Sequence, residues 1–111
     1  MDKKLYDNIG SLSLDECHLA TLQWSRERGI LDNGKTTTQT LKLVSEVGEL
    51  ADNVGKGRSV VDDIGDCLVV LSNLAHLEGL ALEECWNHAL NDIKDRKGHL
   101  NEMGNFIKNE G

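Results

Sequence analysis

The stretch from residue 60 to residue 79, VVDDIGDCLVVLSNLAHLEG, decides the predicted fold. Between Ile64 and Leu77 it is apolar almost all round, and the chain shows no convincing strand-like alternation. A helix that is apolar on every side is normally buried at the centre of a protein. We therefore predict a central helix over about residues 59–78, which begins at the capping residue Ser59 and ends at Gly79.

Three further helices are predicted around this one, over about residues 14–28, 38–54 and 82–97. The first begins where Ser13 and Glu16 have the spacing of a capping box, and Gly29 ends it. The second carries apolar residues that step by four, three and four, at Leu43, Val47, Leu50 and Val54. We expect the tail after the fourth helix to be irregular. Four helices with short connections predict an all-α protein, a single-domain antiparallel four-helix bundle over residues 1–111.

Charge and cysteine content exclude several classes of protein. The formal net charge is −7 without a dense basic run, which argues against a protein that coats nucleic acid. The three cysteines lie far apart, as free thiols of a reducing compartment do. The N-terminus lacks an apolar signal core, and no run approaches the roughly 18 apolar residues of a membrane span. We expect a cytoplasmic protein with neither a membrane nor a nucleic-acid partner.

Acidic residues interrupt the apolar pattern on two consecutive helices. Asp66 lies in the middle of the apolar helix, one turn after Asp63, and Glu46 and Glu49 are three residues apart on the helix before. A buried carboxylate is costly unless it is paired or bound to a metal. Two antiparallel helices can bring these four carboxylates together, where oxygen-only ligands suit Mg²⁺ or Mn²⁺. The alternatives are a solvated face for the glutamates and a buried salt bridge for the aspartates.

The fourth helix carries a complementary set of residues. Asn91 and Lys94 are three apart on one face, and Lys97 follows near the end of the helix. Basic residues at this position also complement the helix dipole. Beside an acidic metal cluster they would hold phosphate oxygens. The combination predicts a site for a polyphosphate substrate.

The order and spacing of the acidic pairs resemble a known family, the MazG-like all-alpha nucleoside triphosphate pyrophosphohydrolases. Its signature is ExxE, a spacer, then ExxD; here Glu46-Val-Gly-Glu49 is followed by thirteen residues and Asp63-Ile-Gly-Asp66. The segments LKLVSEVGELADNVGKG and DDIGDCLVVLSNLA resemble the second and third helices of the family. TLQWSRERGI and the ending IKDRKG…GNFIK resemble short, single-domain, phage-type members. One departure is Asp63, where the family usually has Glu, so that Asp62 is an alternative fourth ligand.

The resemblance implies hydrolysis of a nucleoside triphosphate to the monophosphate and pyrophosphate. It also implies a homodimer or homotetramer whose site is completed across a subunit interface, in the host cytoplasm if the protein is phage-encoded. Our hypothesis is that Glu46, Glu49, Asp63 and Asp66 hold Mg²⁺ and that Glu49 orients or deprotonates a water for attack on the α-phosphorus. The predicted phosphate ligands are Lys42, Asn91, Lys94 and Lys97. Trp24 is predicted either to stack on the base or to pack in the core, and Trp86 to lie in the core.

Two other functions remain open at this point. One is a dimeric all-alpha dUTPase, which the chain ending also resembles, although those chains are usually longer. The other is a non-enzymatic, acidic helical module whose exposed glutamates dock a basic partner. The sequence does not distinguish between nucleobases.

Overall fold

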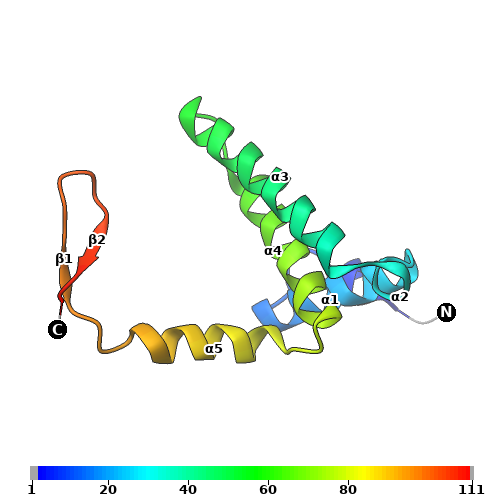
Figure 1. Ribbon diagram of the computed structural model, residues 1–111. Coiled ribbons are helices and arrows are strands. Elements are labelled where there is room, and N and C mark those ends of the chain that lie inside the picture. The colour runs from blue at the N-terminus through cyan, green and yellow to red at the C-terminus, as the bar shows by residue number, and fades with distance from the viewer. Residues whose placement is uncertain (1–2, 111) are drawn as a thin grey trace.

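An antiparallel helical hairpin dominates the computed structural model, which describes residues 3–110. Helices α3 (Thr36–Gly55) and α4 (Val61–Leu77) make the most extensive helix-to-helix contact in this range, and residues 56–60 connect them (Figure 1). On the inner face of α4, Val70 and Ala75 are buried. The hairpin therefore forms from neighbouring segments of the chain whose apolar faces meet.

The N-terminal region packs across α4. Helix α1 (Leu14–Glu27) contacts α4, and it is covered by the 3₁₀-helix η1 (Leu5–Asn8) and the short helix α2 (Ile30–Asn33). The predicted capping box is present: Ser13 Oγ accepts from the Glu16 amide at 3.2 Å, and Glu16 Oε1 accepts from the Ser13 amide at 3.0 Å. Gly29, at φ 76°, adopts the left-handed conformation that ends α1 and begins α2.

The C-terminal part of the chain projects away from this body. Helix α5 (Leu82–Ile93) turns by 102° from α4, and α4 is the only helix or strand among residues 3–110 that it contacts. Strands β1 (Gly98–Leu100) and β2 (Phe106–Lys108) follow as an antiparallel hairpin at the far end (Figure 1). A side chain at Gly98 would collide with the Ile107 carbonyl oxygen, at 2.0 Å from an added Cβ, so this close strand crossing requires glycine. We call α5, this β-hairpin and the segment that joins them the arm.

The structure agrees with the sequence on a mainly helical protein and corrects several details. The four predicted helices are present, but α5 turns outward, so one chain does not form the predicted four-helix bundle. Helix α5 ends at Ile93, four residues earlier than predicted, because the chain turns into the β-hairpin where an irregular tail was expected. Helix α4 begins at Val61 with Val60 as its N-cap, one residue after the predicted cap Ser59.

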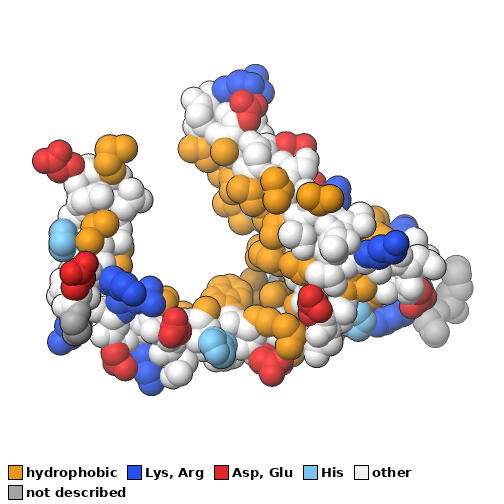
Figure 2. Space-filling view, in the orientation of Figure 1, with side chains coloured by type: hydrophobic (Ala, Val, Ile, Leu, Met, Phe, Trp, Pro, Cys, Tyr) orange, Lys and Arg blue, Asp and Glu red, His pale blue; other side chains and the backbone are white. Residues whose placement is uncertain are grey.

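A broad apolar surface remains uncovered. The outer face of α4 is exposed, with Val61 at 81% and Ile64 at 49%, although the sequence predicted a helix buried all round. Hydrophobic side chains gather along the hollow between the α3–α4 hairpin and the arm (Figure 2). The radius of gyration is 16.9 Å, against about 13 Å for a compact domain of 100 residues. Among the described residues, no single helix could span a membrane; α4 and α5 would do so only as a pair, across their bend.

Candidate active site

Three carboxylates meet on the α3–α4 hairpin. Glu46 and Glu49 lie one turn apart on α3, and Asp66 on α4 faces them because the two helices run antiparallel. One oxygen atom from each side chain lies within 4.8 Å of the others. Three of the four predicted metal ligands thus come together within one chain, from two packed helices. We call these three residues the carboxylate cluster.

The cluster lacks sufficient positive charge of its own. Glu46 is only 9% exposed; Lys42 Nζ lies 3.4 Å from its Oε1, while its Oε2 has no hydrogen-bond partner. The negative charge of Glu46 is the main cause that raises the pKa of Glu49. Burial is the main cause that raises the pKa of Asp66, followed by the charge of Asp62. Repelling carboxylates of this kind are stabilised by a cation.

Asp63 lies beside the cluster but outside it. Its side chain is 6% exposed and accepts a hydrogen bond from Asn53 Nδ2 at 2.9 Å. Neither Asp63 nor Asp66 forms an ion pair with a lysine or arginine in residues 3–110. The amide of Asn53 therefore pairs with the Asp63 carboxylate, and the described residues include no salt bridge from a basic side chain to Asp63 or Asp66.

The donor set fits a hard divalent cation. All three cluster ligands offer oxygen atoms, as Mg²⁺ and Mn²⁺ prefer. The buried, unpartnered Oε2 of Glu46 is an acceptor that folding alone leaves unsatisfied. Glu49, on the exposed side, keeps the cluster open to a ligand from solvent.

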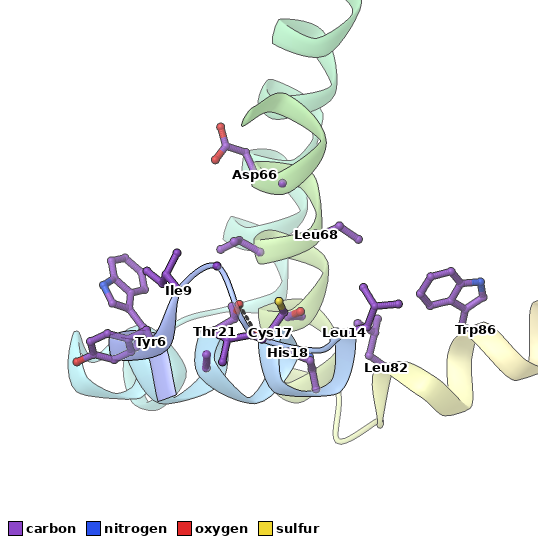
Figure 3. Close-up of a pocket in the computed structure, with 17 residues that line it drawn as sticks. Tyr6, Ile9, Leu14, Cys17, His18, Thr21, Asp66, Leu68, Leu82 and Trp86 are labelled. Carbon is purple, nitrogen blue, oxygen red and sulfur yellow. Dashed lines mark hydrogen bonds between the residues drawn. The ribbon is translucent and has the colours of Figure 1, made fainter. Parts of the chain in front are cut away.

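Two cavities adjoin the cluster. A cavity of about 290 Å³ is lined by Lys42, Glu46 and Asp66 at one end, with Trp24 also in its wall. A larger, mainly apolar cavity of about 760 Å³ lies between η1, α1, α4 and the start of α5. In Figure 3, Asp66 stands at one end of it and Trp86 at another. Trp86, predicted to lie in the core, is 55% exposed.

The other predicted site residues divide into two groups. Lys42 and Trp24 lie beside the cluster; Trp24 is 39% exposed, and the guanidinium of Arg28 lies 4.9 Å from its ring centroid. Asn91, Lys94 and Lys97 lie on the arm, which makes no contact with α3. A single chain therefore does not bring these three to the carboxylates.

Comparison with known proteins assigns the chain to a family. The family model of the MazG nucleotide pyrophosphohydrolase domain matches residues 35–101. The chain belongs to this family. It is also 40% identical over 55 residues to an "Uncharacterized 18.2 kDa protein in rep-hol intergenic region" of Haemophilus phage HP1. That match covers 48% of this chain and 34% of the phage protein, so the chain spans about a third of this relative's length. No solved structure matches the chain.

The MazG match contains the whole carboxylate cluster and also the arm residues Asn91, Lys94 and Lys97. Helix α1, which contributes Trp24 to the cavity wall, lies before the matched residues. The match therefore includes both the carboxylate cluster and the arm residues, and it leaves the α1 side of the cavity outside the matched range.

Two polar residues beside the carboxylate cluster were assigned no role from the sequence. Gln39 is 8% exposed and Asn73 is 3% exposed, and both line the 290 Å³ cavity. Gln39 lies one turn before Lys42 on the face of α3 that carries Glu46, and Asn73 lies two turns after Asp66 on α4. Their helical spacing from Glu46 and Asp66 is visible in the sequence, but only the structure shows that both residues are buried.

Proposed function

We propose that this MazG-family protein hydrolyses a nucleoside triphosphate to the monophosphate and pyrophosphate, with Mg²⁺ or Mn²⁺ as its cofactor. The observation that carries the proposal is the meeting of three carboxylate oxygens within 4.8 Å. Glu46, Glu49 and Asp66 would hold the metal. Asp63 is the proposed fourth ligand, with Asp62 as the alternative, since Asp63 lies beside the cluster and the amide of Asn53 holds its carboxylate.

The bound metal would neutralise phosphate oxygens and lower the pKa of a water molecule. Glu49, on the exposed side, would orient a water molecule and accept its proton as the water oxygen attacks the α-phosphorus. The new bond joins the water oxygen to the α-phosphorus, and the bond from that phosphorus to the bridging oxygen of pyrophosphate breaks. Lys42, fixed beside Glu46, binds a phosphate oxygen close to the reacting centre.

The site also requires a second copy of the chain, in a homodimer or homotetramer. Asn91, Lys94 and Lys97 lie on an arm that does not reach α3 of its own chain, so we propose that a partner's arm supplies them to bind the leaving pyrophosphate. The exposed apolar side chains of α4 and α5 support this arrangement; Ile64 is 49%, Trp86 55% and Leu90 51% exposed. Monomeric proteins rarely leave so large a contiguous apolar surface in water.

A purely partner-binding role is less well supported. It predicts that both glutamates of the cluster are exposed for docking, but Glu46 is buried. It also predicts that divalent ions do not stabilise the fold.

Product analysis tests the proposed reaction directly. Purified protein with Mg²⁺ and a panel of nucleoside triphosphates should release pyrophosphate; release of orthophosphate would contradict attack at the α-phosphorus. In a parallel melting experiment, Mg²⁺ at a hundredfold its dissociation constant should add about 2.7 kcal/mol to the free energy of unfolding. An unchanged melting temperature at saturating Mg²⁺ would remove the metal from the proposal.

A further inference from the structure

The larger of the two cavities beside the carboxylate cluster is built mostly by the N-terminal region. Its volume is about 760 Å³, and more than half of the residues that line it precede residue 35, where the match to the family model begins. Asp66, Val69 and Trp24 line both this cavity and the smaller one, so the two adjoin each other beside the proposed metal site. Small-molecule sites usually have volumes of about 300–1,000 Å³ and mainly apolar walls. The larger cavity falls well within that range, whereas the cavity of 290 Å³ lies at its lower limit.

A glycine keeps the wall of α4 open next to Asp66. Gly65 lines the larger cavity and lies in the interior of α4, one residue before Asp66. A Cβ added at this position would meet no atom within 4 Å, and the backbone is not left-handed, so neither packing nor conformation requires glycine here. Glycine in the middle of a helix is destabilising relative to alanine. The fold therefore gains nothing from the missing side chain, whereas a ligand beside Asp66 gains space.

The rest of the cavity wall is mainly aromatic and aliphatic. Two of its hydroxyl groups already donate within the chain: Thr21 Oγ1 donates to the Cys17 carbonyl oxygen at 2.9 Å, and the Tyr6 hydroxyl donates to Glu27. The rings of Tyr6 and Trp24 both belong to the wall. Aromatic side chains stack on any nucleobase, because every base has a π-face. This surface therefore suits the flat, partly apolar ring of a nucleoside.

We propose that the nucleoside of the substrate binds at the Asp66 end of the larger cavity, in the space that Gly65 leaves, and that stacking and apolar contact hold its base. In Figure 3, Tyr6 and Ile9 lie toward the side of Asp66, while Trp86 lies on the opposite side. Helix η1 and the residues after it therefore form the outer wall of this nucleoside site. The assignment rests on the proposed function, because the carboxylate cluster would hold the phosphates of the same nucleotide through the metal.

A substitution that fills the cavity tests the site without requiring turnover. We would measure, by calorimetry with full-length protein and Mg²⁺, the binding of inorganic pyrophosphate and of the α,β-methylene analogues of dATP, dGTP, dCTP and dTTP. Wild-type protein should bind the best analogue about tenfold or more tightly than pyrophosphate, as expected when one base stacks on an aromatic side chain. Gly65→Leu should weaken analogue binding about tenfold or more, since a mismatch of one methylene in an apolar pocket already changes discrimination about 10–200-fold. Its affinity for pyrophosphate should be unchanged.

Gly48→Leu is the matched control. Gly48 also lies inside a helix, one residue before Glu49, and an added Cβ would meet no atom within 4 Å, but Gly48 lines neither cavity. Both glycine variants should melt at the wild-type temperature or above it, because each removes a glycine from a helix interior. Only Gly65→Leu should lose analogue affinity. If Gly65→Leu does not fold, Ile9→Ser decides: Ile9 is 81% exposed, so its replacement should leave the fold intact and weaken analogue binding.

The assignment would be overturned by a wild-type protein that binds no analogue more tightly than pyrophosphate. Unchanged analogue affinity in folded Gly65→Leu, or in Ile9→Ser if that variant has to decide, would also overturn it. If Gly65→Leu changes only the oligomeric state, seen by light scattering, the cavity holds a second chain and the assignment is wrong. The proposed hydrolysis is judged separately, by pyrophosphate release from nucleoside triphosphates. Selective loss of analogue binding without any wild-type turnover would reject the hydrolysis alone, and full turnover by Gly65→Leu would reject the nucleoside site alone.

Discussion

The α3–α4 hairpin and the arm differ in which of their side chains are buried within one chain. The hairpin buries side chains between its own helices and sets three carboxylates within 4.8 Å of one another. Helix α5 has no buried residue, and its apolar side chains face the hollow beside α4. The carboxylate cluster is therefore organised within one chain, while the proposed phosphate ligands on the arm lie away from it.

Removing a charge from the hairpin should have the largest effect. Glu49→Gln and Asp66→Asn keep the side-chain shape but remove a proposed metal ligand. We expect pyrophosphate release to fall at least about 100-fold, since loss of a residue that only supports a metal ligand already costs about 10–100-fold. The Mg²⁺-dependent rise in melting temperature should shrink as well. Both are measured with purified variants over a range of Mg²⁺ concentrations.

The matched control for these variants is Asp52→Asn. Asp52 is exposed on α3 and pairs with Lys56 at 2.8 Å, outside the cluster, so its loss should leave activity within about twofold, as expected for an exposed ion pair. Full activity in Glu49→Gln would remove Glu49 from the proposed reaction.

Disrupting the apolar face of the arm should have the next largest effect. Trp86→Asp and Leu90→Asp place charge where we expect a second chain, and burial of each such apolar side chain contributes about 1.5–3 kcal/mol. The double variant should therefore associate at least about 100-fold more weakly. Size-exclusion chromatography with light scattering would show a monomer, with His88→Gln at an exposed position on the other side of α5 as control. A wild-type protein that is already monomeric at high concentration would contradict the proposed oligomer.

Neutralising the lysines of the arm should have a moderate effect on catalysis. Lys94→Gln and Lys97→Gln remove the proposed charged contacts to phosphate. Hydrogen bonds to charged groups contribute about 1.5–3 kcal/mol, so kcat/KM should fall about tenfold or more per residue. Lys35→Gln removes an equal charge at an exposed position and should change little.

A mixing experiment sharpens this prediction. Glu49→Gln protein and Lys94→Gln/Lys97→Gln protein are each impaired, but a mixed oligomer contains a site with intact carboxylates and an intact arm. Recovery of activity on mixing would show that the arm acts in trans. If mixing never restores activity although subunits exchange, the lysines do not act from the partner.

The smallest expected effect is on the pH dependence of stability without metal. The pKa of Glu49 is raised above its ordinary value of 4.5, so the folded protein binds this proton more tightly than the unfolded chain. The resulting stabilisation is complete at pH below 4.5 and is lost as the pH rises through the raised pKa. The melting temperature of Glu49→Gln should therefore rise relative to wild type as the pH approaches neutrality. Saturating Mg²⁺ should reverse this difference, because the metal binds the deprotonated carboxylates.

The sequence predicted the individual helices well because their determinants are local. Helix period, the Ser13 capping box and the glycine stops are all written within a few residues of the feature they specify. The direction of α5 depends instead on which surface covers its apolar face, and helical periodicity gives no information about that. The bundle within one chain was therefore wrong, while the helices themselves were found.

The candidate site was predictable to the same extent. Spacing of three along α3, together with an antiparallel neighbour, was enough to place Glu46 and Glu49 near Asp66. The buried state of Gln39 and Asn73 was not predictable, because it depends on α1 and α2 closing one side of the hairpin. The fourth ligand also stays a prediction, since Asp63 lies beside the cluster with its carboxylate held by Asn53.

The short connection at residues 56–60 has a consequence for how the protein reaches its native state. Contacts between α3 and α4 join neighbouring segments, and contacts of low sequence separation form early and quickly. The carboxylates are therefore driven together before most of the remaining structure is present to offset their repulsion. Divalent ions should then act already on the folding pathway, accelerating closure of the hairpin, while assembly through the arm follows as a slower step that depends on protein concentration.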